Sequence, residues 1–165
     1  MRDREFLASL RHQEQQFRAG REGAHPFIVA FEGRFIRRMR ALGVPMFAHE
    51  VWRMPERQDE LYRAGRSKAK AGQSPHNFGC AVDLVHGTQG WNLNDQQWSL
   101  IGHVGKEVAL SLGVKLVWGG DWKFYDPAHW ELADWRVIRG VFQSNPDVRT
   151  VPEALALLAK ERSQV

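Results

Sequence analysis

The spacing of apolar residues along the chain predicts several helices. Apolar positions recur at helical intervals over residues 26–42, and the residues at their ends indicate helices over residues 55–66 and 94–113 as well. Pro55 stands at the start of the second segment, where helices favour proline, and Asn94 is a suitable N-cap for the third. A polar helix is expected over residues 3–19, and two more helices are expected near the C-terminus, over residues 135–142 and 152–162.

Four other segments are rich in branched and aromatic residues and predict strands. They are VPMFAHEVW, CAVDLV, VKLVWGGDW and AHWEL, at residues 44–52, 80–85, 114–122 and 128–132, and the strand in the third runs into a Gly-Gly turn. Short strands mixed with helices, without a regular βαβ alternation, predict an α+β fold with a mainly antiparallel sheet flanked by helices. We expect a single domain over residues 1–165, with a helical extension at 1–25 and C-terminal helices at 133–165.

Composition and charge narrow the class of protein. The chain has 165 residues, of which 43% are hydrophobic and 25% charged, as in soluble globular proteins. It has no apolar run of the roughly 18 residues that span a bilayer, and its charged N-terminus lacks a stretch of signal-peptide type. We therefore expect a chain made in the cytoplasm that needs another route for any export.

The net charge of +4 and a pI near 9.6 suit an anionic partner, such as nucleic acid, a lipid headgroup surface or an acidic cell-wall polymer. The arginines are scattered, however, and a solvated basic surface is the simpler interpretation. Because Cys80 is the single cysteine, an internal disulfide and a cysteine-based zinc cluster are excluded. Cys80 itself is expected to be a small buried packing residue. A metal site would have to use His, Asp and Glu.

The segment SPHNFGCAVDLVHG places a carboxylate, Asp83, within an apolar strand. An unpartnered carboxylate there would cost several kcal/mol, so Asp83 should have a cation, hydrogen-bond donors or a metal ion beside it. His76 lies seven residues upstream, in a loop that Gly79 allows to bend sharply. The loop can therefore fold back toward the strand.

The segment DPAHWEL supplies a second pair of polar residues. Aspartate followed by proline fits the first two positions of a type I turn, which brings its first and fourth residues, Asp126 and His129, within about 7 Å. A catalytic zinc site needs three protein ligands, an open position for water and a nearby general base. His76, Asp83 and His129 fit as ligands and Asp126 fits as the base, although each histidine alone could be an ordinary hydrogen-bonded imidazole.

These segments resemble a known family. GQSPHNFGCAVD and WGGDWKFYDPAHWEL are similar to the VanY-like zinc peptidases of the D-alanyl-D-alanine carboxypeptidase and L-alanyl-D-glutamate endopeptidase family, particularly its bacteriophage endolysin branch. The family motifs S-x-H-x-x-G-x-A-x-D and D-x-x-H are both intact. The upstream WRMPERQDELYRAGR is similar to the family segment Y-R-S-x-x-x-Q-x-x-L-Y, so the resemblance extends from Pro45 to Leu132.

The resemblance implies a Hedgehog/DD-peptidase-like fold that holds one zinc ion on His76, Asp83 and His129, with Asp126 as catalytic base. Arg53 matches the family arginine that contacts substrate, and Ser74 matches the motif serine. Arg53 could grip a substrate carboxylate or steady a developing oxyanion, its alternative being a surface salt bridge. The chain departs from the family pattern at three positions that concern the peptide groove, namely Trp52, Met54 and Trp130.

Further residues near the motifs are open to two interpretations. Glu131 should share the face of His129, either supporting that ligand or lying at the surface. Trp122, with Trp118 and Trp130, could wall the substrate groove, and core packing is expected for at least one of the three. His86 should face away from the site, since it follows Asp83 by three residues in a strand.

The resemblance implies an endolysin that hydrolyses the L-alanyl-D-glutamate bond of peptidoglycan stem peptides. Two alternatives stay open: a D-alanyl-D-alanine carboxypeptidase or dipeptidase with the same site, and a non-catalytic zinc-containing module that binds cell wall. The expected partner is the stem peptide, with no nucleic acid and no stable membrane insertion, and the expected state is a monomer. Such a protein would remain in the cytoplasm of the infected host until its release to the cell wall and periplasm.

Overall fold

The computed structural model describes residues 1–143, 147–148 and 150–162, and these contain seven α-helices and four strands. The helices are α1 (Arg4–Leu7), α2 (Leu10–Gln15), α3 (Pro26–Ala41), α4 (Pro55–Arg63), α5 (Asp95–Ser111), α6 (Trp135–Gln143) and α7 (Val151–Arg162). The strands are β1 (Met46–Glu50), β2 (Ala81–His86), β3 (Leu116–Trp118) and β4 (His129–Leu132). Two short 3₁₀ helices, η1 (Pro75–Phe78) and η2 (Gly119–Asp121), precede β2 and follow β3.

The strands form one antiparallel sheet in the order β1-β2-β4-β3. The predicted α+β class with a mainly antiparallel sheet is therefore confirmed. The register places Asp83 of β2 opposite His129 of β4, and also opposite Glu50 of β1 after an irregularity between Ala48 and Glu50. Three polar residues from three strands thus meet at one end of the sheet.

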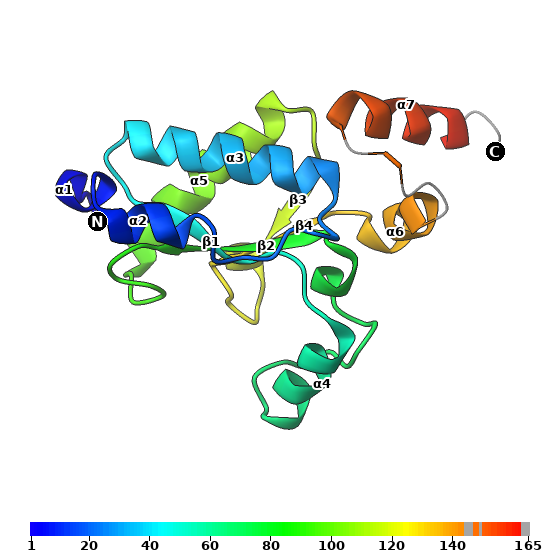
Figure 1. Ribbon diagram of the computed structural model, residues 1–165, viewed down its shortest axis with the longest axis horizontal. Helices are drawn as coiled ribbons and strands as arrows, with labels where there is room; N and C mark the ends of the chain where they lie inside the picture. The colour runs from blue at the N-terminus through cyan, green and yellow to red at the C-terminus, as the bar shows by residue number, and fades with distance from the viewer. Residues whose placement is uncertain (144–146, 149, 163–165) are drawn as a thin grey trace.

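The two faces of the sheet have different coverings. Helices α3 and α5 lie across one face, whereas α4 and the loop that follows β3 project from the other (Figure 1). The core fills the helix-covered side, where the Trp130 ring lies 5.1 Å from Phe31 and stacks at 5.8 Å on Trp118. A Cβ at Gly105 would lie 2.3 Å from the Trp130 ring, so α5 can approach the sheet only because this position is glycine.

One predicted element differs from the structure. The single helix expected over residues 3–19 is wrong, because the segment forms the two short helices α1 and α2. The break occurs at Ser9, whose hydroxyl accepts a hydrogen bond from the backbone N–H of His12 at 3.2 Å and so starts a new helix. Within the described residues, no helix has both the length and the apolar character needed to cross a membrane.

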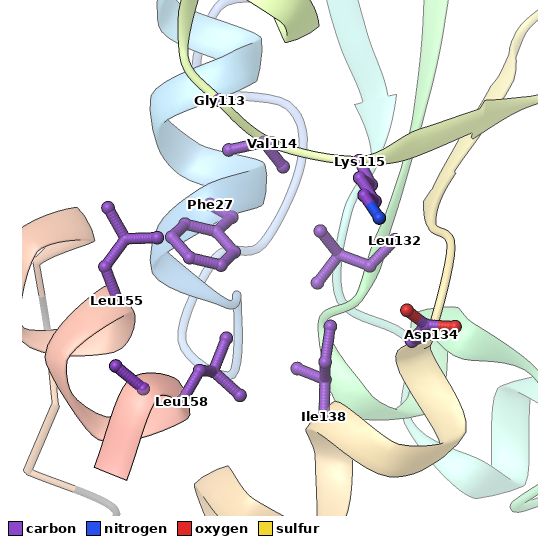
Figure 2. A pocket seen from close by; sticks show the side chains of 10 residues that line it. Phe27, Gly113, Val114, Lys115, Leu132, Asp134, Ile138, Leu155 and Leu158 are labelled. Carbon is purple, nitrogen blue, oxygen red and sulfur yellow. The ribbon is translucent and has the colours of Figure 1, made fainter. Parts of the chain in front are cut away.

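The C-terminal helices close one end of the core. A hollow of about 270 Å³ lies there. Phe27 of α3 points into it, between Leu155 and Leu158 of α7 on one side and Leu132 and Ile138 on the other (Figure 2). Its lining is mainly apolar, and it lies at the seam where α6 and α7 meet α3. The helices predicted over residues 135–142 and 152–162 are confirmed in their described parts.

A buried histidine at the start of α3 is expected to make the fold sensitive to acid. His25 is the N-cap, and its Nδ1 accepts a hydrogen bond from the backbone N–H of Phe27 at 3.1 Å. Burial lowers the pKa of His25 from 6.5 to about 4. As the pH falls from about 6.5 to 4, His25 therefore becomes protonated in the unfolded chain but stays neutral in the folded chain. The free energy of unfolding should fall across that window by an amount of the order of 3 kcal/mol.

We expect His25→Asn, which keeps an acceptor at the N-cap but does not titrate, to lose less unfolding free energy between pH 7 and pH 4 than the unsubstituted protein. Urea denaturation of metal-free protein at both pH values measures the difference. Equal losses in the two proteins would show that His25 does not set the acid sensitivity.

Candidate metal centre

One 3₁₀ helix and two strands bring His76, Asp83 and His129 together. Asp83 and His129 are paired across β2 and β4, and η1 carries His76 beside them. The chain turns from η1 into β2 at Gly79, whose φ is 62° and where a Cβ would lie 1.9 Å from the carbonyl oxygen of Gly23. Only glycine fits this turn, and the turn allows His76 to fold back beside Asp83.

The three side chains form a triangle of donor atoms. His76 Nε2 lies 3.3 Å from Asp83 Oδ1, His129 Nδ1 lies 3.0 Å from the same oxygen, and the two nitrogens are 3.3 Å apart. Bonds of about 2.0–2.1 Å in tetrahedral geometry separate two ligand atoms by about 3.3 Å. Two imidazoles and a carboxylate are also a donor set that zinc accepts. The residues therefore fit the ion in both chemistry and spacing.

The remaining nitrogen of each imidazole is held by a neighbouring acceptor. His76 Nδ1 lies 2.9 Å from the carbonyl oxygen of Val51, which fixes the proton on that nitrogen and leaves the lone pair of Nε2 facing Asp83. His129 Nε2 lies 3.1 Å from Glu131 Oε2, which orients the second ring in the same way. Of the two interpretations of Glu131, the structure therefore favours support of His129 over a plain surface glutamate.

The charges of the clustered side chains stabilise one another. Burial would raise the pKa of Asp83, but the charge and hydrogen bonds of His76 and His129 lower it well below its usual value. Burial would likewise lower the pKa of His129, yet hydrogen bonds to Asp83 and Glu131 raise it to about 9. A divalent cation at the centre of the triangle would replace these protons as the partner of Asp83.

Asp126 reaches the same cleft from the turn that precedes β4. The backbone N–H of His129 donates to the carbonyl oxygen of Asp126 at 3.1 Å, the bond expected for the predicted turn. The indole N–H of Trp118 donates to the carbonyl of Pro127 at 2.8 Å and holds the turn against the core. Burial, and then the charge of Asp83, raise the pKa of Asp126, against the opposing effects of His129, His76 and Arg53.

Arg53 lies in the cleft and not on the outer surface, so a plain surface salt bridge is the wrong interpretation. Its side chain is 9% exposed, forms an ion pair with Glu50, and donates to Gln58 Oε1 at 2.7 Å. One guanidinium nitrogen lies 3.9 Å from Asp83 Oδ2. Within the described part of the chain, the buried Nε–H of Arg53 has no hydrogen-bond partner.

Gln58 and Glu50 are the polar residues that sequence reasoning missed. The Gln58 side chain is completely buried, and its amide nitrogen donates to the Ala69 carbonyl at 2.6 Å and to Ser67 Oγ at 2.9 Å. It therefore connects Arg53 to the loop that follows α4. The Q of the motif-like segment WRMPERQDELYRAGR was the available signal for it.

The cleft has a volume of about 390 Å³ and is lined by the cluster, Asp126 and Arg53, among others. Trp122 also lines it, with its ring 5.2 Å from that of His129. Ser74 is buried at its edge, where its hydroxyl accepts the backbone N–H of His76 at 3.4 Å and caps η1. Lys68 and Phe124 form another part of the wall, with Lys68 Nζ 4.1 Å from the centre of the Phe124 ring.

Other residues singled out from the sequence lie away from the cleft. Trp118 and Trp130 are buried in the core, as expected for at least one of the tryptophans. His86 Nε2 lies 2.6 Å from the carbonyl oxygen of Met1. His86 therefore bonds to the N-terminal segment and not to the donor triangle, as predicted. Cys80 is buried, and burial raises the pKa of its thiol to about 12, which agrees with a packing role.

Comparisons with known proteins find similar sequences and similar folds. Residues 67–132 match a family described as D-alanyl-D-alanine carboxypeptidase. The chain is 33% identical over 109 residues to the peptidoglycan L-alanyl-D-glutamate endopeptidase CwlK of Bacillus subtilis (strain 168), an alignment that covers 54% of this chain and 62% of CwlK. The chain thus spans less than two thirds of the length of this curated relative.

Two solved structures have similar folds. The L-Ala D-Glu endopeptidase ChiX of Serratia marcescens is 27% identical, with a TM-score of 0.58 over 88% of this chain and 94% of ChiX. The vancomycin resistance D,D-pentapeptidase VanY, solved in complex with Zn(II), shares the fold at 15% identity, with a TM-score of 0.50 over 80% of this chain and 83% of VanY.

The matched segment runs from the loop after α4 through η1, β2, α5 and β3 to the end of β4, and so contains all three corners of the donor triangle and Asp126. This match, the similarity to CwlK and the ChiX-like fold support a relationship to the VanY-like zinc peptidases, and the His-Asp-His cluster fits such a family.

Proposed function

We propose that the protein is a zinc-dependent peptidoglycan peptidase that hydrolyses the L-alanyl-D-glutamate bond of stem peptides. The observation that carries this proposal is the donor triangle of His76, Asp83 and His129, with Asp126 lining the same cleft. A purely structural zinc site would close its fourth position with a protein ligand and would have no use for a spare carboxylate. The names of CwlK and ChiX favour the L-alanyl-D-glutamate bond.

His76, Asp83 and His129 would hold the ion. Zinc bound there supplies a Lewis acid and lowers the pKa of water from about 15.7 toward about 7. Asp126 accepts the proton of the attacking water and returns it to the departing amine. Arg53 lines the cleft, where its guanidinium group can bind a substrate carboxylate or the developing oxyanion. Trp122 and Ser74 line the same cleft and contact the peptide there.

One digestion tests the proposal. Purified peptidoglycan is incubated with the zinc-loaded protein, with and without a chelator, and the new amino termini are identified by mass spectrometry. We expect new N-terminal D-glutamate that disappears with chelator. The absence of any metal-dependent cleavage would overturn the proposal and favour a module that only binds the cell wall.

The second candidate is a D-alanyl-D-alanine carboxypeptidase with the same site. It is favoured by the description of the family whose model matches residues 67–132. The same digestion separates the two, because the carboxypeptidase would release free D-alanine and leave the L-alanyl-D-glutamate bond intact.

The buried amide of Gln58 should position Arg53 and the cleft wall. Gln58→Met keeps a long side chain but cannot bond Arg53 at one end or the Ala69 carbonyl at the other. We expect the free energy of unfolding to fall by about 1–3 kcal/mol for the groups left unpaired. We also expect kcat/KM to fall by about tenfold as Arg53 loses its orientation. Urea denaturation and peptide kinetics measure the two effects, and unchanged kinetics would remove Gln58 from the site.

We further propose a lytic role of the bacteriophage type, in which the protein acts at the cell wall after leaving the cytoplasm where it was made. Support comes from the segments WGGDW and DPAHWEL, whose sequences are similar to those of the bacteriophage endolysin branch of the family. Expression of the chain in a bacterial cytoplasm, with and without a pore-forming partner, tests this role. We expect lysis only with the pore, and no lysis in either case would contradict it.

A further inference from the structure

A second hollow adjoins the metal cleft. It has a volume of about 360 Å³ and is lined by residues of the N-terminal segment, the β1 end and α4, namely Arg18, Ala19, Gly20, His49, Glu50, Trp52, Arg57, Leu61 and Arg66. Leu61 and Arg66 line the metal cleft as well. The two hollows therefore adjoin, with Leu61 and Arg66 lining both.

The hollow is positively charged, and two of its cations are available. Three arginines line it, whereas its one carboxylate, Glu50, is already paired with Arg53. Arg57 forms an ion pair with Glu60 at 2.7 Å. Arg18 and Arg66 form no ion pair with an acidic side chain in the described ranges of the chain. A ligand carboxylate would therefore meet uncompensated guanidinium groups there.

The wall that carries Arg18 is held in place by a buried ion pair. Arg21 donates to Glu32 of α3, a residue that is 5% exposed, and also donates to the backbone carbonyls of Ala19 and Gln16, on either side of Arg18. The backbone N–H of Trp52 donates to the Gly20 carbonyl at 3.2 Å and joins this segment to the end of β1. Arg18 thus projects from a fixed backbone.

The opposite wall is similarly fixed. The backbone N–H groups of Arg66 and Ser67 both donate to the Leu61 carbonyl, at 2.9 and 3.2 Å, and close the end of α4. Between the two walls, Trp52, Leu61 and Ala19 provide apolar surface. This combination suits a carboxylate carried on an aliphatic arm, with the carbon chain against the apolar residues and the charge between Arg18 and Arg66.

We propose that this hollow, the arginine subsite, binds a carboxylate on the departing side of the substrate, beyond the D-glutamate residue. The inference rests on the proposed function, because a stem peptide cleaved after L-alanine has its carboxylates on the D-glutamate side. The shared Arg66 and Leu61 favour the same peptide in both hollows over a separate anionic polymer. Arg18, Arg57 and Arg66 lie outside residues 67–132, the segment that matches the family model.

Two synthetic peptides test the subsite. Both contain L-alanine, γ-linked D-glutamate and diaminopimelate, and they differ only in whether the diaminopimelate carboxylates are free or amidated. We expect the zinc-loaded protein to cleave the free form with a kcat/KM at least about tenfold higher, mainly through KM, since hydrogen bonds to a charged group are lost on amidation. The double variant R18Q/R66Q should lose this preference and cleave both peptides at the same bond.

The matched control is R37Q/R40Q, which removes the same charge from exposed positions of α3 on the other side of the sheet. It should keep the preference. Equal cleavage of both peptides by the unsubstituted protein, or loss of the preference in the control, would overturn the subsite. Binding of the double variant to a glycerol-phosphate polymer is measured as well. The subsite would also be overturned if R18Q/R66Q still discriminated between the two peptides and lost only its affinity for this polymer.

Failure of the proposed function would look different, since neither peptide would then be cleaved by any variant. Calorimetric titration of the zinc-loaded protein with the two peptides would still decide the subsite in that case. Tighter binding of the free peptide that disappears in R18Q/R66Q supports it, and equal binding of the two peptides contradicts it.

Discussion

Asp126→Asn is expected to retain bound zinc and to lose hydrolysis by a factor of about 10²–10⁴, the usual contribution of a positioned general base. Asparagine preserves the shape of the side chain but cannot accept the proton of the attacking water. The turn should survive, because the group that accepts the hydrogen bond from the backbone N–H of His129 is the backbone carbonyl of Asp126 and not its side chain. Peptide kinetics together with metal analysis of the same sample measure the two properties.

Asp121→Asn is the matched control for this experiment. Asp121 lies five residues upstream, is exposed and is paired with Lys106, so its replacement changes the same charge without entering the cleft. Its activity should stay close to that of the unsubstituted protein. Full activity in Asp126→Asn would exclude this carboxylate as the base.

Asp83→Asn should have the second large effect, the loss of zinc. It removes the only carboxylate corner of the donor triangle and leaves two imidazoles. Replacing a residue that merely supports a ligand costs about 10–100-fold in metal affinity, so the loss of a ligand should exceed that range. Competition with a coloured chelator measures the affinity, and hydrolysis should fall in parallel.

Folding should be largely retained in Asp83→Asn, because the core lies on the other face of the sheet, around Phe31, Phe35 and Trp130. Circular dichroism of the metal-free variant checks this point. A variant that is folded and binds zinc as tightly as the unsubstituted protein would show that Asp83 is not a ligand. His76→Ala and His129→Ala provide the corresponding tests of the other two corners.

Much of the candidate site could be predicted from the sequence because its parts are local. A carboxylate in an apolar strand, a glycine-turned loop and an Asp-Pro turn are each readable from neighbouring residues, and the structure brings His76, Asp83 and His129 together as those patterns indicate. The main strands and helices were predictable for the same reason, since burial on one face gives each its own periodicity.

The features that the sequence did not predict depend on contacts between distant segments. Gln58 reads as an ordinary polar helix residue, and only the packing of the following loop over α4 makes it a buried bridge between Arg53 and Ala69. The arginine subsite likewise requires Arg18 and Arg66 to meet across 48 positions of the chain. The break at Ser9 was missed because a hydroxyl that could lie on a helix surface instead caps a new helix.

The most direct measurement is the zinc position in crystals of the zinc-soaked protein, located by anomalous diffraction at the zinc edge. We expect one peak within about 2.0–2.2 Å of His76 Nε2, an Asp83 oxygen and His129 Nδ1, with the fourth position free of protein ligands and facing Asp126. A peak elsewhere, a fourth ligand from the protein, or no peak at this cluster would contradict the proposed catalytic centre.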